Sequence, residues 1–462
     1  MRRMSVIAVV VSLIIISIAD AARRTSTGGR QPRRFHAYVT NTGDDSVSVI
    51  DLSTGAPLAT PISVGPSPSA LAISPDQQRV FVANAQTNTV SVIDTETRRV
   101  VATTVLGQAS VRAVGVTVGL DGQRAFVTHP RGNTVYTVHT ASNARDDLFP
   151  MSGQPSGLAW IMKAGPFLYV STPADRGVTS VDLFETRRSR RLIPTGRQPW
   201  SIVASPDGQL VYVTDVEESK VSAISTVTDR VVSVFPVGRS PDGLAITPDG
   251  RRLIVASLQA PQAHILNPLD GNVMAVVPTG SSMRTNQPGL NRVAVSPDGL
   301  HAVVANEDDD TITVIDLKAM VVRATVPVVD QPTGVVIVGK AAVCDPRPSV
   351  MDFGDVPLAH GSVEQVLSLT NRGTETLQLT RLTIDTPAFQ IDGTARSLAP
   401  RETARFIVRF VANGLGEHLA TLRIEANDPD PDRCFVRLRA VRRASLSSGR
   451  GPAIAGDEHA CR

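Results

Sequence analysis

The sequence is poor in cysteine, lysine and aromatic side chains. Of its 462 residues, three are cysteine and 4% are aromatic, while lysine stands only at 163, 220, 318 and 340. The net charge of +3 is spread along the chain, which argues against a dedicated nucleic-acid-binding protein, since such proteins concentrate basic residues. Wholesale disorder is excluded as well, because 42% of the residues are hydrophobic. The 34 glycines and 32 prolines instead indicate many turns, as in a β protein.

The N-terminus has the pattern of a targeting segment. Arg2 and Arg3 precede an apolar run over 4–19, and Ala19-Asp20-Ala21 fits a small-residue cleavage site. A retained membrane anchor is the alternative, but the run is shorter than the roughly 20 residues that a span needs. We expect a signal peptide over 1–21 and a flexible lead-in over 22–34. The mature protein should then be extracytoplasmic (periplasmic, surface-bound or secreted), with no membrane span after cleavage.

Internal repeats are the strongest feature of the sequence. A four-residue element recurs seven times, at intervals of 42 to 49 residues: YVTN at 38–41, FVAN at 81–84, FVTH at 126–129, YVST at 169–172, YVTD at 212–215, IVAS at 254–257 and VVAN at 303–306. A second strand such as VSVID, a third apolar stretch and a fourth strand ending in a turn such as SPDG follow most copies. Four short strands per roughly 44 residues predict the blades of a β-propeller.

The ring of blades needs closure. The first blade lacks a strand before YVTN, and a leftover strand at 333–340 can supply it. The same segment nearly matches a phosphate-binding loop, Gly334 to Ala341, but Ala341 replaces the required Ser or Thr and no helix follows. We therefore favour a closing strand and a seven-bladed propeller over 35–341.

The repeat residues resemble those of the YVTN-family β-propeller, also called the surface-layer or lactonase-like propeller. The resemblance covers about two thirds of the chain through YVTN, VSVID and SPDG. It implies the fold and an extracytoplasmic location more than a reaction, because the family contains binding proteins as well as distant enzyme relatives.

A second β domain is expected over 345–441, followed by a disordered tail over 442–462. In ARFIVRFV at 404–411, apolar and arginine side chains alternate, which is typical of a sandwich strand. The segment resembles the abnormal-spindle/hydin-type (choice-of-anchor D) immunoglobulin-like domain, through FGDV at 353–356 and LTNRG at 369–373 among others. It departs from that family at Arg401, where Gly is frequent. The resemblance implies an interaction module or a spacer.

The cysteines and acidic runs suggest little chemistry. Cys344 and Cys434 stand at the first and last strands of the second domain, and we expect a disulfide between them, with free thiols as the alternative. No cofactor and no metal site are predicted, because the eight histidines are scattered. A calcium loop at Glu307–Asp310 or at Asp428–Asp432 is less favoured than a solvated loop or a hairpin turn.

A candidate ligand site emerges when the innermost strands of the blades are aligned. At the strand starts stand Trp200, Asp242, Asn291 and Arg292, and the preceding loops add Arg197, Arg239 and Arg284. Charged and aromatic residues at one mouth of the channel suit a ligand. The alternative is a water-filled channel with paired charges, for example Asp242 with Arg292.

These features favour a non-catalytic binding or adhesion scaffold that recognises an envelope or extracellular protein or a glycan. The alternative is a lactonase-like hydrolase of a small sugar lactone, with Asp242 as its general base. Nucleic-acid binding through the arginine run at 187–191 is the least favoured.

Overall fold

The structure is a computed structural model that describes residues 35–107, 113–163, 165–184, 189–281, 292–394, 396–412, 414–428 and 434–444. The predicted signal peptide and lead-in lie outside these residues, as does nearly all of the predicted tail. Regular structure is almost wholly β, with two 3-10 helices, Pro173–Asp175 and Leu358–His360, in the described ranges. None of the helices in these ranges has the length and apolar character needed to cross a bilayer. The predicted all-β fold class is confirmed.

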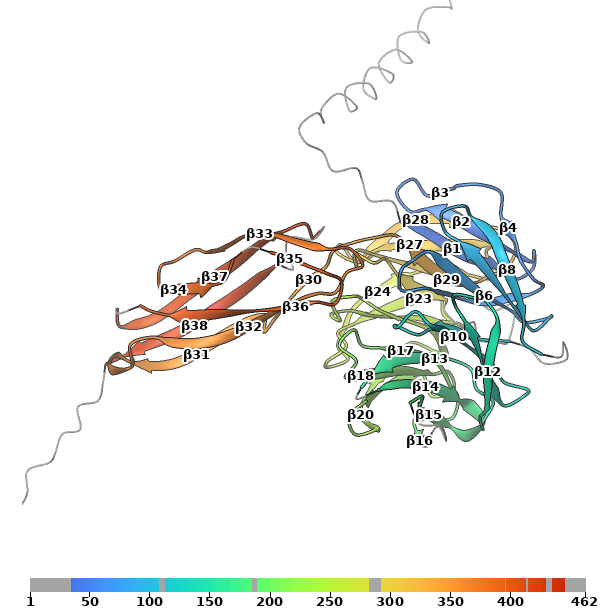
Figure 1. The fold of residues 1–462 in the computed structure, drawn as a ribbon, viewed down its shortest axis with the longest axis horizontal. Helices are drawn as coiled ribbons and strands as arrows, with labels where there is room; N and C mark the ends of the chain where they lie inside the picture. The colour runs from blue at the N-terminus through green and yellow to red at the C-terminus, as the bar shows by residue number, and fades with distance from the viewer. Residues whose placement is uncertain are drawn as a thin grey trace, which may run out of the picture. The chain divides into compact units, whose positions relative to one another are not determined.

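Seven sheets of the described residues correspond to the seven sequence repeats, and Figure 1 follows them from blue to yellow. The first consists of β29 (Pro332–Val338), β1 (His36–Asn41), β2 (Ser46–Asp51), β3 (Ala56–Pro57) and β4 (Ile62–Ser63). The next three are β5 (Pro68–Ile73), β6 (Arg79–Asn84), β7 (Thr89–Asp94) and β8 (Arg99–Val105); β9 (Val116–Val118), β10 (Arg124–His129), β11 (Thr134–His139) and β12 (Arg145–Pro150); and β13 (Leu158–Met162), β14 (Pro166–Thr172), β15 (Gly177–Asp182) and β16 (Arg190–Pro194). The last three are β17 (Pro199–Ala204), β18 (Leu210–Asp215), β19 (Lys220–Ser225) and β20 (Arg230–Pro236); β21 (Pro241–Ile246), β22 (Leu253–Ser257), β23 (Gln262–Leu266) and β24 (Val273–Pro278); and β25 (Val293–Val295), β26 (His301–Asn306), β27 (Thr311–Asp316) and β28 (Val321–Pro327).

The innermost strands close a ring. Each of β29, β5, β9, β13, β17, β21 and β25 contacts the next, and β25 contacts β29 again. The ring is joined by β29, which pairs antiparallel with β1 so that Val336 faces Tyr38. The strand near 333–340 is thus the predicted closing strand and not a phosphate-binding loop.

The tyrosine of the YVTN element joins neighbouring sheets. The Tyr38 hydroxyl donates to the Thr95 carbonyl at 3.3 Å, and the Tyr212 hydroxyl donates to the Pro268 carbonyl at 3.0 Å. Tyr169 donates to the carboxylate of Asp229. In each case the acceptor lies on a loop of the following sheet, so this motif position links blades.

The asparagine of the element joins strands within a sheet. Asn41, Asn84 and Asn306 are fully buried. Each side-chain amide donates at 2.9–3.0 Å to two hydroxyls on the next strand; these acceptors are Ser46 and Ser48, Thr89 and Ser91, and Thr311 and Thr313. Buried polar groups need such partners. The repeated motif is therefore explained by folding.

The second domain forms two packed sheets. One contains β30 (Cys344–Arg347), β32 (Val363–Asn371), β36 (Thr403–Phe410) and β34 (Phe389–Asp392). The other contains β31 (Val350–Pro357), β38 (Phe435–Arg443), β37 (Gly416–Ala426), β33 (Leu377–Ile384) and β35 (Ser397–Leu398). On β36, Phe406, Val408 and Phe410 are buried in the core between the sheets, as their alternation predicts.

The predicted disulfide is absent from this structure. Cys344 and Cys434 are both buried, and no disulfide joins them. Both contact the carboxylate of Asp428, whose Oδ2 accepts the Cys344 backbone N–H at 2.6 Å and lies 3.9 Å from the Cys434 Sγ. The two residues are therefore organised around a carboxylate and not by a covalent bond. Cys461 lies outside the described residues.

Candidate ligand site on the propeller axis

Two residues of the predicted site form a buried ion pair. Arg292 Nε lies 2.8 Å from Asp242 Oδ2, and Arg292 Nη2 lies 3.3 Å from Glu307 Oε2. The side chains of Arg292, Asp242 and Glu307 are exposed by only 1%, 0% and 1%. A charge this deeply buried needs its partners, and a ligand cannot reach it. The prediction that Arg292 and Asp242 face a ligand is therefore corrected in favour of the paired-charge alternative.

The remaining residues of the predicted set are described only in part. Trp200 is half-buried and packs against an apolar cluster of the second and third sheets. Arg197 is largely exposed, with its Nε 3.9 Å from Glu218, and Arg239 is exposed. Arg284 and Asn291 lie outside the described residues. A ligand role for these residues therefore stays a prediction.

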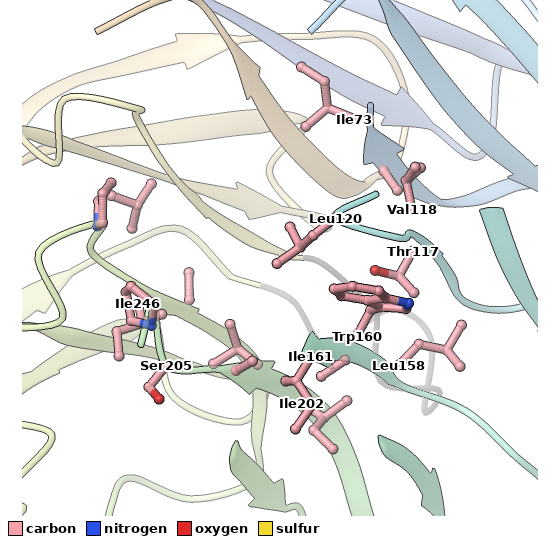
Figure 2. A pocket seen from close by; sticks show the side chains of 18 of the residues that line it. Ile73, Thr117, Val118, Leu120, Leu158, Trp160, Ile161, Ile202, Ser205 and Ile246 are labelled. Atoms are coloured by element: carbon pink, nitrogen blue, oxygen red, sulfur yellow. The ribbon is translucent and has the colours of Figure 1, made fainter. Parts of the chain in front are cut away.

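The structure has a cavity on the axis, away from the strand starts. Its volume is about 770 Å³, within the usual range for small-molecule sites. All seven innermost strands contribute to its wall, mostly with aliphatic side chains. Figure 2 shows Ile73, Leu120, Trp160, Ile202 and Ile246 around this space. Sequence analysis did not single out any of these five residues as part of a site.

Turns at the ends of the innermost strands form one rim of the cavity. Asp207 Oδ1 accepts the Ser205 hydroxyl at 2.6 Å and the Gln209 N–H at 3.1 Å. Asp121 Oδ1 accepts the Gln123 N–H at 3.0 Å. These carboxylates, which also line the cavity, have their Oδ1 atoms engaged within their own turns.

Two arginines of the second domain also line the cavity, Arg372 and Arg401. Arg372 Nη1 donates to the Pro206 carbonyl at 2.9 Å, and its Nε donates to Asp345 Oδ2 at 3.2 Å. Arg401 Nη1 donates to the Leu120 carbonyl at 3.3 Å. Partial burial lowers the pKa of the Arg401 guanidinium. The second domain thus adds two guanidinium groups to a cavity whose wall is mostly aliphatic, with Asp121 and Asp207 at the same rim.

The described residues contain no group of three or more His, Cys, Asp or Glu side chains that could hold a metal ion. The acidic run 307–310 is engaged by the protein itself. Asp309 Oδ2 accepts the Ser281 N–H at 2.7 Å, and Asp310 Oδ1 accepts the Gln331 N–H at 2.9 Å. Of the second acidic run, 429–432 lie outside the described residues.

Comparison with known proteins supports the architecture. Residues 344–441 match the family model of the HYDIN/CFA65/VesB-like Ig-like domain. No curated protein matches this sequence.

Solved structures similar to this chain align with about two thirds of it. A functionally unknown protein from Desulfotomaculum acetoxidans shares 17% identity over 65% of this chain and 98% of its own, with a TM-score of 0.57. A "putative 6-phosphogluconolactonase" from Bacteroides uniformis shares 17% identity over 66% of this chain and 100% of its own, with a TM-score of 0.54. Apo AztD from Citrobacter koseri shares 12% identity over 66% of this chain and 98% of its own, with a TM-score of 0.51. At these identities the likeness shows the fold alone.

Proposed function

We propose that this protein is an extracytoplasmic, non-catalytic binding scaffold whose ligand is a small molecule in the axial cavity. The observation that carries the proposal is the cavity itself, which residues of all seven innermost strands line, mainly with aliphatic side chains. Burying apolar surface in it supplies binding energy of about 25 cal/mol per Å². A glycan suits these walls less well than an apolar or amphipathic molecule, because buried hydroxyls need hydrogen-bond partners.

The residue expected as the general base of the lactonase alternative, Asp242, does not line the axial cavity. It is fully buried against Arg292 and cannot reach a substrate. The Oδ1 atoms of Asp121 and Asp207, which line the cavity, are occupied by turn hydrogen bonds. Binding without turnover is therefore the function that this geometry favours.

A neutral fluorescent probe tests the proposal. Phenylnaphthylamine brightens in apolar surroundings, and we expect the full chain to bind it with a saturable signal. Ala204→Phe, which places a large ring at the cavity wall, should weaken binding at least tenfold. Ala56→Phe, on the exposed strand β3, is the matched control and should bind like the wild type. Absence of saturable binding, or equal loss in both variants, would overturn the proposal.

A further inference from the structure

We propose that the ligand of the axial cavity is an amphipathic anion, whose charged head is bound by Arg401 and Arg372 of the second domain while its apolar body lies along the innermost strands. This inference rests on the proposed function and names the chemical class of its ligand. It also makes the immunoglobulin-like domain a part of the binding site rather than a spacer.

Arg401 has unused capacity for an anion. Among the described residues its guanidinium makes no ion pair, and its one hydrogen bond to a protein acceptor goes to the Leu120 carbonyl. The pKa of this group is lowered by burial, with no opposing contribution from a carboxylate. An anion beside the guanidinium would stabilise its charged form and so offset the effect of burial on the pKa.

The backbone at Arg401 also departs from what an arginine prefers. Its φ is 68°, in the left-handed region that is unfavourable for a residue with a Cβ. A strained backbone that positions a cationic side chain at a cavity is consistent with a functional role. Arg401 lies in a turn that the Glu402 N–H closes on the Ala399 carbonyl at 3.0 Å. The Arg401 N–H donates to the Asn371 carbonyl at 2.7 Å, which places this turn beside the residue that precedes Arg372.

Arg372 is held in place for the same task. Asp345 is fully buried and accepts the Nε of Arg372, while the Pro206 carbonyl accepts Nη1. Neither of these bonds uses the second terminal nitrogen, so this cavity-lining side chain still has Nη2 as a hydrogen-bond donor. Guanidinium groups bind carboxylates and phosphates through paired N–H donors, and these bonds are strong where water is partly excluded.

The cavity wall suits the apolar body of the proposed ligand. Ile73, Ile202 and Ile246 surround the space in Figure 2, and they offer no hydrogen bonds from their side chains. Asp121 and Asp207 lie at the same rim, but both are solvent-exposed. Their Oδ1 atoms accept turn N–H groups, and neither carboxylate forms an ion pair with Arg401 among the described residues. A head group with one negative charge on an aliphatic or aromatic body matches both surfaces.

Two fluorescent probes that differ by one charge test the inference on the full chain. Dansylaminoundecanoic acid should bind at least tenfold more tightly than its neutral methyl ester, because only the acid pairs with the arginines. Arg401→Gln and Arg372→Gln should each reduce binding of the acid by about tenfold and leave the ester unchanged. Arg347→Gln is the matched control, since Arg347 binds the Asp249 carbonyl and Asp345 but does not line the cavity.

The outcomes separate the two proposals. Equal affinity for acid and ester, or an acid affinity that neither cavity arginine changes, overturns the anion assignment and leaves the cavity as an apolar site. Failure to bind either probe overturns the proposed function as well. An equal loss in Arg347→Gln overturns the direct role of the arginines, because it means that domain contact alone matters. Displacement by lauric acid or by dodecyl phosphate then shows which head group is preferred.

Discussion

Arg292 Nε lies 2.8 Å from Asp242 Oδ2, where both side chains are shielded from solvent. Arg292 directly precedes β25 and Asp242 lies in β21, so this ion pair joins the innermost strands of two neighbouring sheets. Glu307, beyond the end of β26, provides a second carboxylate at 3.3 Å. Two residues of the predicted ligand site, Asp242 and Arg292, therefore link two neighbouring blades through an ion pair.

Removing the arginine should destabilise the propeller. Arg292→Ala leaves Asp242 and Glu307 buried without their cation, and breaking a buried pair in this way costs about 3–5 kcal/mol. Urea unfolding followed by circular dichroism measures the loss. Arg239→Ala, which removes an exposed arginine of the same face, should change the free energy of unfolding by less than about 0.5 kcal/mol. Wild-type stability in Arg292→Ala would return this residue to the candidates for ligand binding.

High pH should weaken the fold through the tyrosines of the repeated element. Burial raises the pKa of Tyr212 and of Tyr38 to about 12, although for Tyr38 the charge of Arg98 partly opposes the shift. The unfolded chain has a tyrosine pKa of about 10. Between these values the unfolded state loses its phenol protons while the folded state keeps them. The stabilisation is thus complete below pH 10 and disappears as the pH rises toward 12.

Phenolate absorbance of the folded protein checks this directly. Tyr38, Tyr169 and Tyr212 should ionise well above the ordinary value, and Tyr212→Phe should reduce the fall in stability between pH 10 and 12. An ordinary pKa for all four tyrosines of the folded chain would contradict the inter-blade hydrogen bonds.

The motif asparagine is expected to be structural. Asn84→Ala removes two hydrogen bonds, to Thr89 and Ser91, and leaves both hydroxyls in a buried site. Losing such partners costs about 1–3 kcal/mol. Thermal unfolding should therefore show a lower midpoint, whereas affinity for the cavity probe at low temperature should stay at the wild-type value. A stable variant with lost binding would show that the motif has a ligand role after all.

Small residues at the strand starts have a steric reason. A Cβ added to Gly157 would lie 2.3 Å from the Trp200 carbonyl oxygen, a backbone atom of the next sheet. Gly157→Ala must therefore separate β13 from β17, at a cost of about 1–3 kcal/mol. Gly414→Ala, where the nearest atom is 3.9 Å away, serves as the control in chemical unfolding. Equal stability of the two variants would contradict the close approach of these strands.

The fold could be predicted from the sequence because its signals are local and repeated. Each YVTN copy starts a period of about 44 residues. The first sheet lacked an innermost strand, and the segment at 333–340 was left to pair with β1 in that position. Period-2 alternation likewise gave the buried face of β36, with Phe406 and Phe410. These features depend on neighbours along the chain, so alignment of the repeats was sufficient.

The site could not be predicted in the same way. Alignment placed Asp242 and Arg292 near one mouth, but it cannot say whether a side chain points into the channel or toward the adjacent blade. The positive charge at the cavity comes from Arg372 and Arg401, which line it together with residues of β17 (Pro199–Ala204). They stand about 170 and 200 residues after that strand in the sequence, so only tertiary contacts bring them there. One signal was present in the sequence, since Arg401 departs from the glycine that is frequent in the resembled domain family.

A crystal structure of the full chain grown with dansylaminoundecanoic acid tests the central claim most directly. We expect the aliphatic chain to lie against Ile202 and Ile246, with the carboxylate within hydrogen-bond distance of Arg401. A probe bound at the opposite mouth, beside Trp200 and Arg239, or an axial cavity that holds only water at saturating probe, would contradict it.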